Sequence, residues 1–202
     1  MREPIAETQE TYDAIAPEYA RRTSTVHPQL FDDVASLTAV LPPGSWVADV
    51  GCGPGQQVRA LREHGFRVVG LDLSHAQLRV GGLTGAARAD MRLLPLRTGS
   101  VDAVWCQAAL LHLPRGDVPG VLAEFGRAVR PGGRLYLSVA DGDGQGWEIA
   151  TNYGSDRRHW FTYHRESDLT ALLSAAGFVV DEVRRTASYR DWLAIHAHRA
   201  AR

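Results

Sequence analysis

The sequence predicts an α/β fold built on one mostly parallel, seven-stranded sheet with helices on both faces. Apolar runs alternate with amphipathic stretches between residues 46 and 139, and this alternation is typical of parallel strands joined by right-handed crossover helices. A glycine-rich segment at 51–55 follows the first strand. The segments 178–183 and 189–198 are joined by too few residues for a crossover helix, so we expect this last pair to be antiparallel.

The predicted strands are short apolar runs. The run at 46–50 leads directly into the glycine-rich segment, and the run at 101–107 is equally apolar. The third strand has little intrinsic support, because glycine and alanine fill the residues before Asp90, and only the alternation requires it. We expect strands at 46–50, 66–72, just before Asp90, 101–107, 134–139, 178–183 and 189–198.

The predicted helices have recognisable ends. Residues 56–64 place Val58 and Leu61 on one side, and Gly65 is suited to close that helix. The helix at 117–129 stops at the Pro-Gly-Gly of 131–133, because proline cannot continue a helix and glycine permits left-handed geometry. The remaining predictions are a helix capped by Ser74 that runs to about Val80, a helix from Ser167 to Ala176 closed by Gly177, and one or two helices in the first 35 or so residues.

Length and charge limit the classes of function. The 202 residues suffice for one sizeable domain and are few for two. We divide this domain into an N-terminal helical cap at 1–40, a cofactor-binding core at 41–140, and a substrate-side insertion with the last strands at 141–202. With 22 basic and 23 acidic residues, the net charge of −1 gives no reason to expect nucleic acid or an anionic membrane as partner.

Two further absences bear on location. No stretch approaches the roughly 20 apolar residues of a membrane helix, and the N-terminus has no apolar core of a secretory signal. The two cysteines, Cys52 and Cys106, give no disulfide framework. We therefore expect a cytoplasmic protein with free thiols, either a monomer or a homodimer.

The glycine-rich segment at 49–55 is the strongest functional signal. Its glycines let the backbone turn sharply and approach a ligand closely. Asp72 ends the second strand about 20 residues later, where an acid can accept both ribose hydroxyls of a nucleoside. A dinucleotide fingerprint would need glycine at position 56, which is Gln56 here. No Gly-Lys-Ser/Thr follows, which excludes a phosphate-binding P-loop. A zwitterionic amino-acid tail beside Asp49 suits this loop better than a pyrophosphate.

These motifs resemble the class I S-adenosylmethionine-dependent methyltransferases, in particular their small-molecule branch with a methyltransferase domain of type 11. The resemblance extends over nearly the whole chain and is most specific at the glycine-rich segment and the acid that follows it. It includes the segments 12–19, 47–55, Asp72, 89–91, 101–107, 130–133 and the region from Phe161 to Phe178. It implies a Rossmann-like fold, methyl transfer from S-adenosylmethionine to a small-molecule acceptor, and S-adenosylhomocysteine as product.

The resemblance also implies roles for individual residues in binding the cofactor. Gly51, Gly53 and Gly55, with Cys52 between them, would pack against the methionine part, whose amine Asp49 would organise. Asp72 would accept the ribose hydroxyls. The remaining implied contacts are Leu73 and Met91 with the adenine ring, Asp90 with its exocyclic amine, Gln107 with the methionine part, and Tyr12 and Tyr19 over the cofactor near its carboxylate.

The acceptor side carries weaker signals. His112 follows the fourth strand and is the best candidate for a general base, because histidine titrates near neutrality; it could equally pack between its leucine neighbours. An aromatic segment follows a flexible, acidic loop at 141–146, and it could wall a small apolar or aromatic acceptor. Its candidate acceptor-binding residues are Trp147, Tyr153, Trp160 and Tyr163. His159 is a second candidate base.

Several alternatives remain open at this stage. The end of the fourth strand, Gln107-Ala108-Ala109-Leu110, departs from the Asn/Asp-Pro-Pro-aromatic pattern of methyltransferases that act on adenine or glutamine amino groups. The histidines have no recognisable acidic partners, so we expect no metal. The sequence leaves open a protein that binds S-adenosylmethionine without transferring a methyl group. A nucleotide-dependent oxidoreductase is disfavoured by Gln56.

Overall fold

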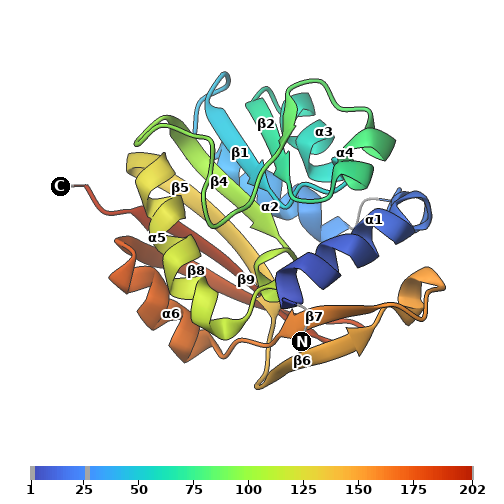
Figure 1. Cartoon of the computed structure of the whole chain (residues 1–202). Coiled ribbons are helices and arrows are strands. Elements are labelled where there is room, and N and C mark those ends of the chain that lie inside the picture. The colour runs from blue at the N-terminus through green and yellow to red at the C-terminus, as the bar shows by residue number, and fades with distance from the viewer. Residues whose placement is uncertain (1–2, 26–27, 202) are drawn as a thin grey trace.

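A computed structural model describes residues 3–25 and 28–201. Its main layer is a seven-stranded sheet in the order β3-β2-β1-β4-β5-β9-β8 (Figure 1). The strands β1 to β5 are parallel neighbours, whereas β9 runs antiparallel to both β5 and β8. This order confirms the predicted sheet. Its strands are β1 (Trp46–Val50), β2 (Arg67–Asp72), β3 (Ala86–Arg88), β4 (Val101–Gln107), β5 (Val129–Ala140), β8 (Phe178–Ala187) and β9 (Asp191–Arg199).

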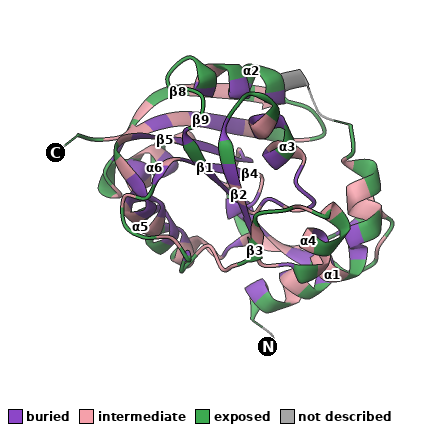
Figure 2. Cartoon of the chain, turned by 90° about the horizontal axis from the view of Figure 1, so that it is seen from above, coloured by how far each residue is buried: buried purple, intermediate pink, exposed green. Residues whose placement is uncertain are grey.

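Helices cover both faces of the sheet, as Figure 2 shows from above. On one face, α5 and α6 bury Phe125 and Leu169 against the sheet. On the other face, α2 and α3 bury Val34 and Leu61. α1 lies outside this two-sided arrangement and packs against α4 and β7. The helices are α1 (Pro4–Arg22), α2 (Pro28–Thr38), α3 (Gln56–Glu63), α4 (His75–Gly81), α5 (Val118–Ala128) and α6 (Glu166–Ala175). Among the described residues, no helix is long and apolar enough to cross a bilayer.

A two-stranded antiparallel hairpin was not predicted. It consists of β6 (Gln145–Ile149) and β7 (Arg158–Thr162), which lie beside α1 in Figure 1. The loop predicted at 141–146 therefore ends at residue 144, because residues 145 and 146 belong to β6. Gly146 has low strand propensity, but its pairing with Phe161 of β7 places it in a strand. The directly opposed pairs include Trp147 with Trp160, and cross-strand aromatic pairs stabilise a hairpin.

Several element boundaries differ from the predicted ones. β5 begins at Val129 instead of residue 134, because Val129 already pairs with Val101 of β4. β8 continues to Ala187, which pairs with Asp191. Helix α6 begins at Glu166 with Arg165 at its N-cap, so the prediction that Ser167 caps it is wrong. By contrast, Ser74 caps α4 as predicted, since its hydroxyl accepts a hydrogen bond from the backbone N–H of Gln77 at 3.2 Å.

A buried polar cluster fastens α2 to the sheet. The carboxylate of Asp33 on α2 is only 1% exposed. It accepts a hydrogen bond from the Tyr136 hydroxyl of β5 at 2.7 Å and lies 2.7 Å from the Arg184 guanidinium of β8. His196 Nε2 of β9 lies 3.4 Å from the same carboxylate. We call these four residues the Asp33 cluster. Because each member is partnered, the buried charge of Asp33 is compensated.

His164 makes unfolding sensitive to pH. Its side chain is 1% exposed, and its Nε2 has no hydrogen-bond partner among the described residues. Burial, with a smaller contribution from Arg115, lowers the pKa of His164 from 6.5 to about 4. The unfolded chain therefore binds a proton in this pH range that the folded chain does not. We expect its contribution to the free energy of unfolding to decrease as pH falls from 6.5 to 4, by about 1.4 kcal/mol per pH unit.

Urea unfolding at several pH values checks this expectation. Between pH 6.5 and 4, the free energy of unfolding of His164→Asn should fall less steeply with decreasing pH than that of the wild type, by about 1.4 kcal/mol per pH unit. Identical slopes for the wild type and the variant would contradict it.

Candidate functional site

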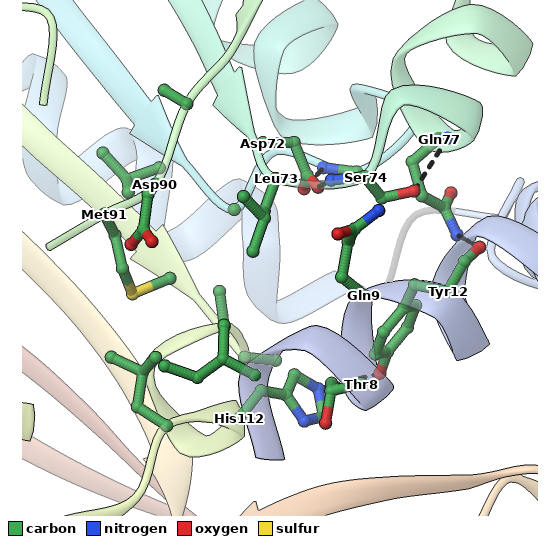
Figure 3. A pocket seen from close by; sticks show the side chains of 18 of the residues that line it. Thr8, Gln9, Tyr12, Asp72, Leu73, Ser74, Gln77, Asp90, Met91 and His112 are labelled. Carbon is green, nitrogen blue, oxygen red and sulfur yellow. Dashed lines mark hydrogen bonds between the residues drawn. The ribbon is translucent and has the colours of Figure 1, made fainter. Parts of the chain in front are cut away.

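The main cavity lies at the carboxyl ends of the central strands. It encloses about 810 Å³, counting its open mouth, and Figure 3 shows side chains that line it. The loops after β1, β2, β3 and β4 supply most of its lining, and α1 supplies the opposite wall. The strand order reverses direction between β1 and β4, and ligands of open α/β sheets bind at such a point.

The glycine-rich turn after β1 is tightly packed. Gly51 has φ +77°, and a Cβ atom added there would lie 2.2 Å from the Cβ of Ala109. Gly55 has φ +85°, and its Cβ would lie 2.2 Å from Cδ1 of Leu83. Both positions therefore require glycine for their backbone conformation. At Gly51 the rigid Cβ of Ala109 also leaves no room for a side chain, whereas at Gly55 the colliding atoms belong to the flexible side chain of Leu83. Gly53 has φ +52°, but the nearest atom to its Cβ would be a ring carbon of Tyr19 at 3.7 Å.

Gly51 and Gly53 allow a matched comparison. Alanine is strained at both positions, but only at Gly51 does it also collide with another side chain. We expect Gly51→Ala to lower the free energy of unfolding by about 1–2 kcal/mol more than Gly53→Ala, which is the range for overpacking. Thermal and urea unfolding of the two variants measure the difference. Equal losses would show that backbone strain alone requires these glycines.

Asp72 is fixed at the edge of the cavity. Its Oδ2 accepts a hydrogen bond from the backbone N–H of Gly53 at 2.7 Å, and its Oδ1 accepts one from that of Ser74 at 2.8 Å. Burial raises the pKa of Asp72, and these backbone hydrogen bonds oppose that change. The carboxylate lines the cavity, and each of its oxygens has lone pairs beyond the one used. It can therefore accept two hydroxyl groups of a ligand.

Asp49 lies behind the lining at the end of β1. Its side chain is 1% exposed, and its Oδ2 has no hydrogen-bond partner among the described residues. Burial and the charge of Asp72 raise the pKa of Asp49. A buried carboxylate oxygen without a donor is costly. A ligand amine near the glycine turn would supply the missing donor, so the residues present fit a zwitterionic ligand.

Leu73, Asp90 and Met91 line the other end of the cavity together. Asp90 receives hydrogen bonds from the backbone N–H of Arg92 at 2.9 Å and from its guanidinium at 2.7 Å. Although burial opposes ionisation, these bonds lower the pKa of Asp90. Apolar side chains beside an ionised carboxylate suit a flat ring with an exocyclic amine.

One wall of the cavity comes from α1, which is held at two places. Asp13 accepts hydrogen bonds from Ser74 Oγ at 2.6 Å and from the backbone N–H of Ala76 at 3.0 Å. At the other place, Thr8 Oγ1 accepts a hydrogen bond from the backbone N–H of Trp160 at 2.8 Å. The helix thus spans from α4 to β7, with Tyr12 and Tyr19 facing the cavity. Figure 3 shows Thr8, Gln9 and Tyr12 on this wall.

Sequence reasoning missed part of this wall. Ile5, Thr8 and Gln9 line the cavity with Tyr12, and their spacing of i, i+3, i+4 and i+7 marks one face of a helix. That spacing was an available signal. The other lining residues that were not predicted are Val50, Ser74, Gln77, Ala89, Ala108, Ala109 and Leu113.

His112 lies where α1 meets the loop after β4. Its Nε2 is 2.8 Å from the Tyr12 hydroxyl, and its Nδ1 is 2.8 Å from the carbonyl oxygen of Trp160. Burial, with the neighbouring His159, lowers the pKa of His112 to about 3. The ring is therefore neutral at physiological pH.

The remaining predicted site residues have different positions. Gln107 lines the cavity, whereas Gly55 and Cys52 do not, and Cys52 is only 2% exposed. The rings of Tyr153 and Tyr19 are 4.9 Å apart, which places Tyr153 behind the wall formed by α1. Tyr163 donates a hydrogen bond to Glu148 at 2.6 Å.

Trp147 and Trp160 do not form part of the cavity wall. The centroids of their rings are 5.3 Å apart. Because the two residues are directly opposed in the hairpin, their side chains lie on the same face. His159 and Phe161 belong to the opposite face, where both rings approach His112. The expected acceptor contacts of the two tryptophans are therefore not found at this cavity. Among the described residues, no group of three or more His, Cys, Asp or Glu side chains could hold a metal ion.

Known proteins similar to this chain include methyltransferases. Residues 48–137 match the family model of the methyltransferase domain. Over 177 residues the chain is 28% identical to the ubiquinone biosynthesis O-methyltransferase of Hahella chejuensis, covering 79% of this chain and 72% of that relative. Residues 48–137 therefore carry a methyltransferase domain, and the chain as a whole is similar to the ubiquinone biosynthesis O-methyltransferases. These matches support the methyltransferase class that the sequence predicts.

Solved structures of such methyltransferases share the fold. The 1,6-didemethyltoxoflavin-N1-methyltransferase of Burkholderia thailandensis, solved with bound 1,6-didemethyltoxoflavin and S-adenosylhomocysteine, has a TM-score of 0.78 at 20% identity, covering 99% of this chain and 92% of that chain. Magnesium protoporphyrin IX methyltransferase of Synechocystis with bound S-adenosylmethionine has a TM-score of 0.79 at 18% identity, covering 99% of both chains. The matched methyltransferase domain and this shared fold support methyl transfer as the chemistry of the chain.

Proposed function

We propose that this methyltransferase methylates a hydroxyl group of a small molecule and releases S-adenosylhomocysteine. The observation that carries the cofactor assignment is the Asp72 carboxylate, which two backbone N–H groups fix at the edge of the cavity. The preference for oxygen is supported by the ubiquinone biosynthesis relative, whose name specifies an O-methyltransferase, and by the neutral His112 at the other side of the cavity.

The cavity residues suit each part of the cofactor. Asp72 would bind the ribose hydroxyls, and Leu73, Asp90 and Met91 would hold the adenine. Asp49 would neutralise the amine beneath the glycine turn. The methionine part would also contact Gly51, Gly53 and Gln107, with Tyr19 of α1 above it. S-adenosylmethionine supplies an activated methyl group on a sulfonium, and positioning alone can lower the barrier for its transfer by several kcal/mol.

The acceptor would enter beside Tyr12 and His112, which line the cavity opposite the adenine-binding residues. Of the predicted aromatic set, Tyr153 lies nearest to this wall, because its ring packs on that of Tyr19; it would support Tyr19 from outside the cavity.

Calorimetry and an activity assay test the proposal. The protein should bind S-adenosylmethionine and S-adenosylhomocysteine, and NAD should give no heat of binding. A panel of phenols, enols, alcohols and amines should then yield S-adenosylhomocysteine only with hydroxyl compounds. Transfer to amines alone would contradict the oxygen assignment. Tight NAD binding without a response to the sulfonium compound would contradict the cofactor assignment.

A further inference from the structure

We propose that the Tyr12 hydroxyl is the group that holds the acceptor's hydroxyl, and that it passes the acceptor's proton on to His112. This inference rests on the proposed O-methylation and concerns the same cavity. It assigns Tyr12 to the acceptor, whereas the resemblance implied a contact between Tyr12 and the cofactor carboxylate. It also makes His112 a positioning residue that acts through Tyr12.

The hydrogen bonds of His112 fix its tautomer. The carbonyl oxygen of Trp160 can only accept, so the Nδ1 atom 2.8 Å away must carry the proton. The Nε2 atom of the neutral ring then has a lone pair. The Tyr12 hydroxyl, at 2.8 Å, must donate its proton to that lone pair. Both side chains line the cavity, and Figure 3 shows the tyrosine hydroxyl directed toward the imidazole.

This arrangement determines what Tyr12 can offer a ligand. A phenol has a single proton, and here that proton is directed to His112. Toward the cavity, the Tyr12 oxygen is therefore a hydrogen-bond acceptor. A ligand group that contacts it must bring a proton of its own, as a hydroxyl does and a tertiary amine does not.

The surroundings of His112 make it a weak base. The groups that face its ring are Tyr12 from α1, His159 and Phe161 from β7, and Arg190 from the turn between β8 and β9. None of them carries a negative charge, and Arg190 and His159 both oppose protonation of the ring. In the part of the chain that the structure describes, no carboxylate is bonded to His112.

A weak base restricts the chemical class of the acceptor. Proton transfer in a transition state is most effective when the acidities of donor and base are not far apart. The acceptor should therefore carry an acidic hydroxyl, such as a phenol or an enol, in preference to an alkyl alcohol.

The bond changes balance as follows. A lone pair of the acceptor oxygen forms the new O–CH₃ bond, and the electron pair of the broken C–S bond remains on sulfur. The acceptor's O–H proton moves to the Tyr12 oxygen while the Tyr12 proton moves to Nε2 of His112. The positive charge of the sulfonium is thus replaced by an imidazolium. Because burial and Arg190 destabilise that imidazolium, it returns its proton through Tyr12 to water once the product leaves.

Binding to the complex with S-adenosylhomocysteine tests the first half of the proposal. A series of substituted phenols, from phenol to 4-nitrophenol, serves as the probe in calorimetry. We expect Tyr12→Phe to weaken phenol binding about fivefold, as for the loss of one neutral hydrogen bond, and to leave S-adenosylhomocysteine affinity within about twofold. The reverse pattern would place Tyr12 at the cofactor and overturn the proposal. If no phenol binds while S-adenosylhomocysteine does, the inference fails but the cofactor assignment stands.

Turnover of the same phenols tests the proton path. In His112→Asn the amide can still donate to the Trp160 carbonyl, but no base remains for the Tyr12 proton. We expect Tyr12→Phe and His112→Asn each to lower kcat about 100-fold, and the double variant to be no slower than either. In Tyr12→Phe, residual activity should rise with pH in step with ionisation of the phenol. Losses that multiply in the double variant, or an unchanged pH profile, would overturn the relay.

Tyr136→Phe provides a matched control, because it removes a buried phenol hydroxyl on the other side of the sheet. It should lower stability and leave both the phenol affinity and the pH profile unchanged. A changed pH profile in this control would show that the assay reports general destabilisation, and the relay would then lose its support.

Discussion

Replacing Asp72 with alanine should weaken the binding of S-adenosylhomocysteine by about 1.5–3 kcal/mol, or roughly 10- to 150-fold. The carboxylate is held by the backbone N–H groups of Gly53 and Ser74 and lines the cavity. Hydrogen bonds to a charged group are stronger than those between neutral groups, and their loss leaves two ribose hydroxyls without partners. Calorimetry at a fixed pH and salt concentration measures the change.

Asp102 supplies the control for this prediction. Its Oδ2 also accepts a backbone hydrogen bond, from the N–H of Trp46 at 2.7 Å. It belongs to the amino-terminal half of β4, whereas the cavity lies at the carboxyl ends of the strands. Asp102→Ala should leave the affinity within about twofold. An unchanged affinity in Asp72→Ala would show that the ribose assignment is wrong.

Replacing Asp33 with alanine should lower the free energy of unfolding by about 3–5 kcal/mol. The substitution removes the nearer carboxylate of Arg184, at 2.7 Å against 3.4 Å for Glu182, and the partner of the buried Tyr136 hydroxyl. Breaking a buried ion pair is costly because the remaining charge loses its nearest partner, and the exposed Glu182 compensates it only in part. The midpoint of urea unfolding should fall with little change in its slope.

A double variant separates the charge from the packing. In Asp33→Leu with Arg184→Leu, no buried charge is left unpaired, so at least about 1 kcal/mol of the loss should return. Cofactor affinity should not change in either variant, because the Asp33 cluster joins α2 to the sheet and none of its residues lines the cavity. Equal stability of the single and the double variant would mean that lost packing, and not an unpaired charge, causes the effect.

The sheet and the cofactor end of the site could be predicted because they depend on local patterns. The strand at 46–50, the glycines after it and Asp72 lie within 27 residues, and parallel strands bring their carboxyl ends to one edge. Even the weakly supported third strand follows from the alternation. Ser74 was identified by its capping chemistry, which operates over three residues.

The rest depends on contacts between distant segments. Strand β6 contains Gly146, a residue type with low strand propensity, and pairing with β7 makes the segment a strand. Thr8 lines the cavity because Trp160 and α4 position α1 there. Asp33 had no recognisable role, since its partners Tyr136 and Arg184 are more than 100 residues away in the sequence. Such pairings leave no periodic signal in a single sequence.

The hydrogen bonds between α1 and β7 also set an order of events during synthesis. Thr11 donates to the carbonyl of Arg158, 147 residues later, and Thr8 accepts from the N–H of Trp160, 152 residues later. At roughly 5–20 residues per second, α1 leaves the ribosome some 10–30 s before β7 exists to receive it. Its apolar residues Ile5 and Ile15 remain open to chaperones for that time. The nascent chain thus forms the glycine turn early, but α1 can close one wall of the cavity only after β7 has been synthesised.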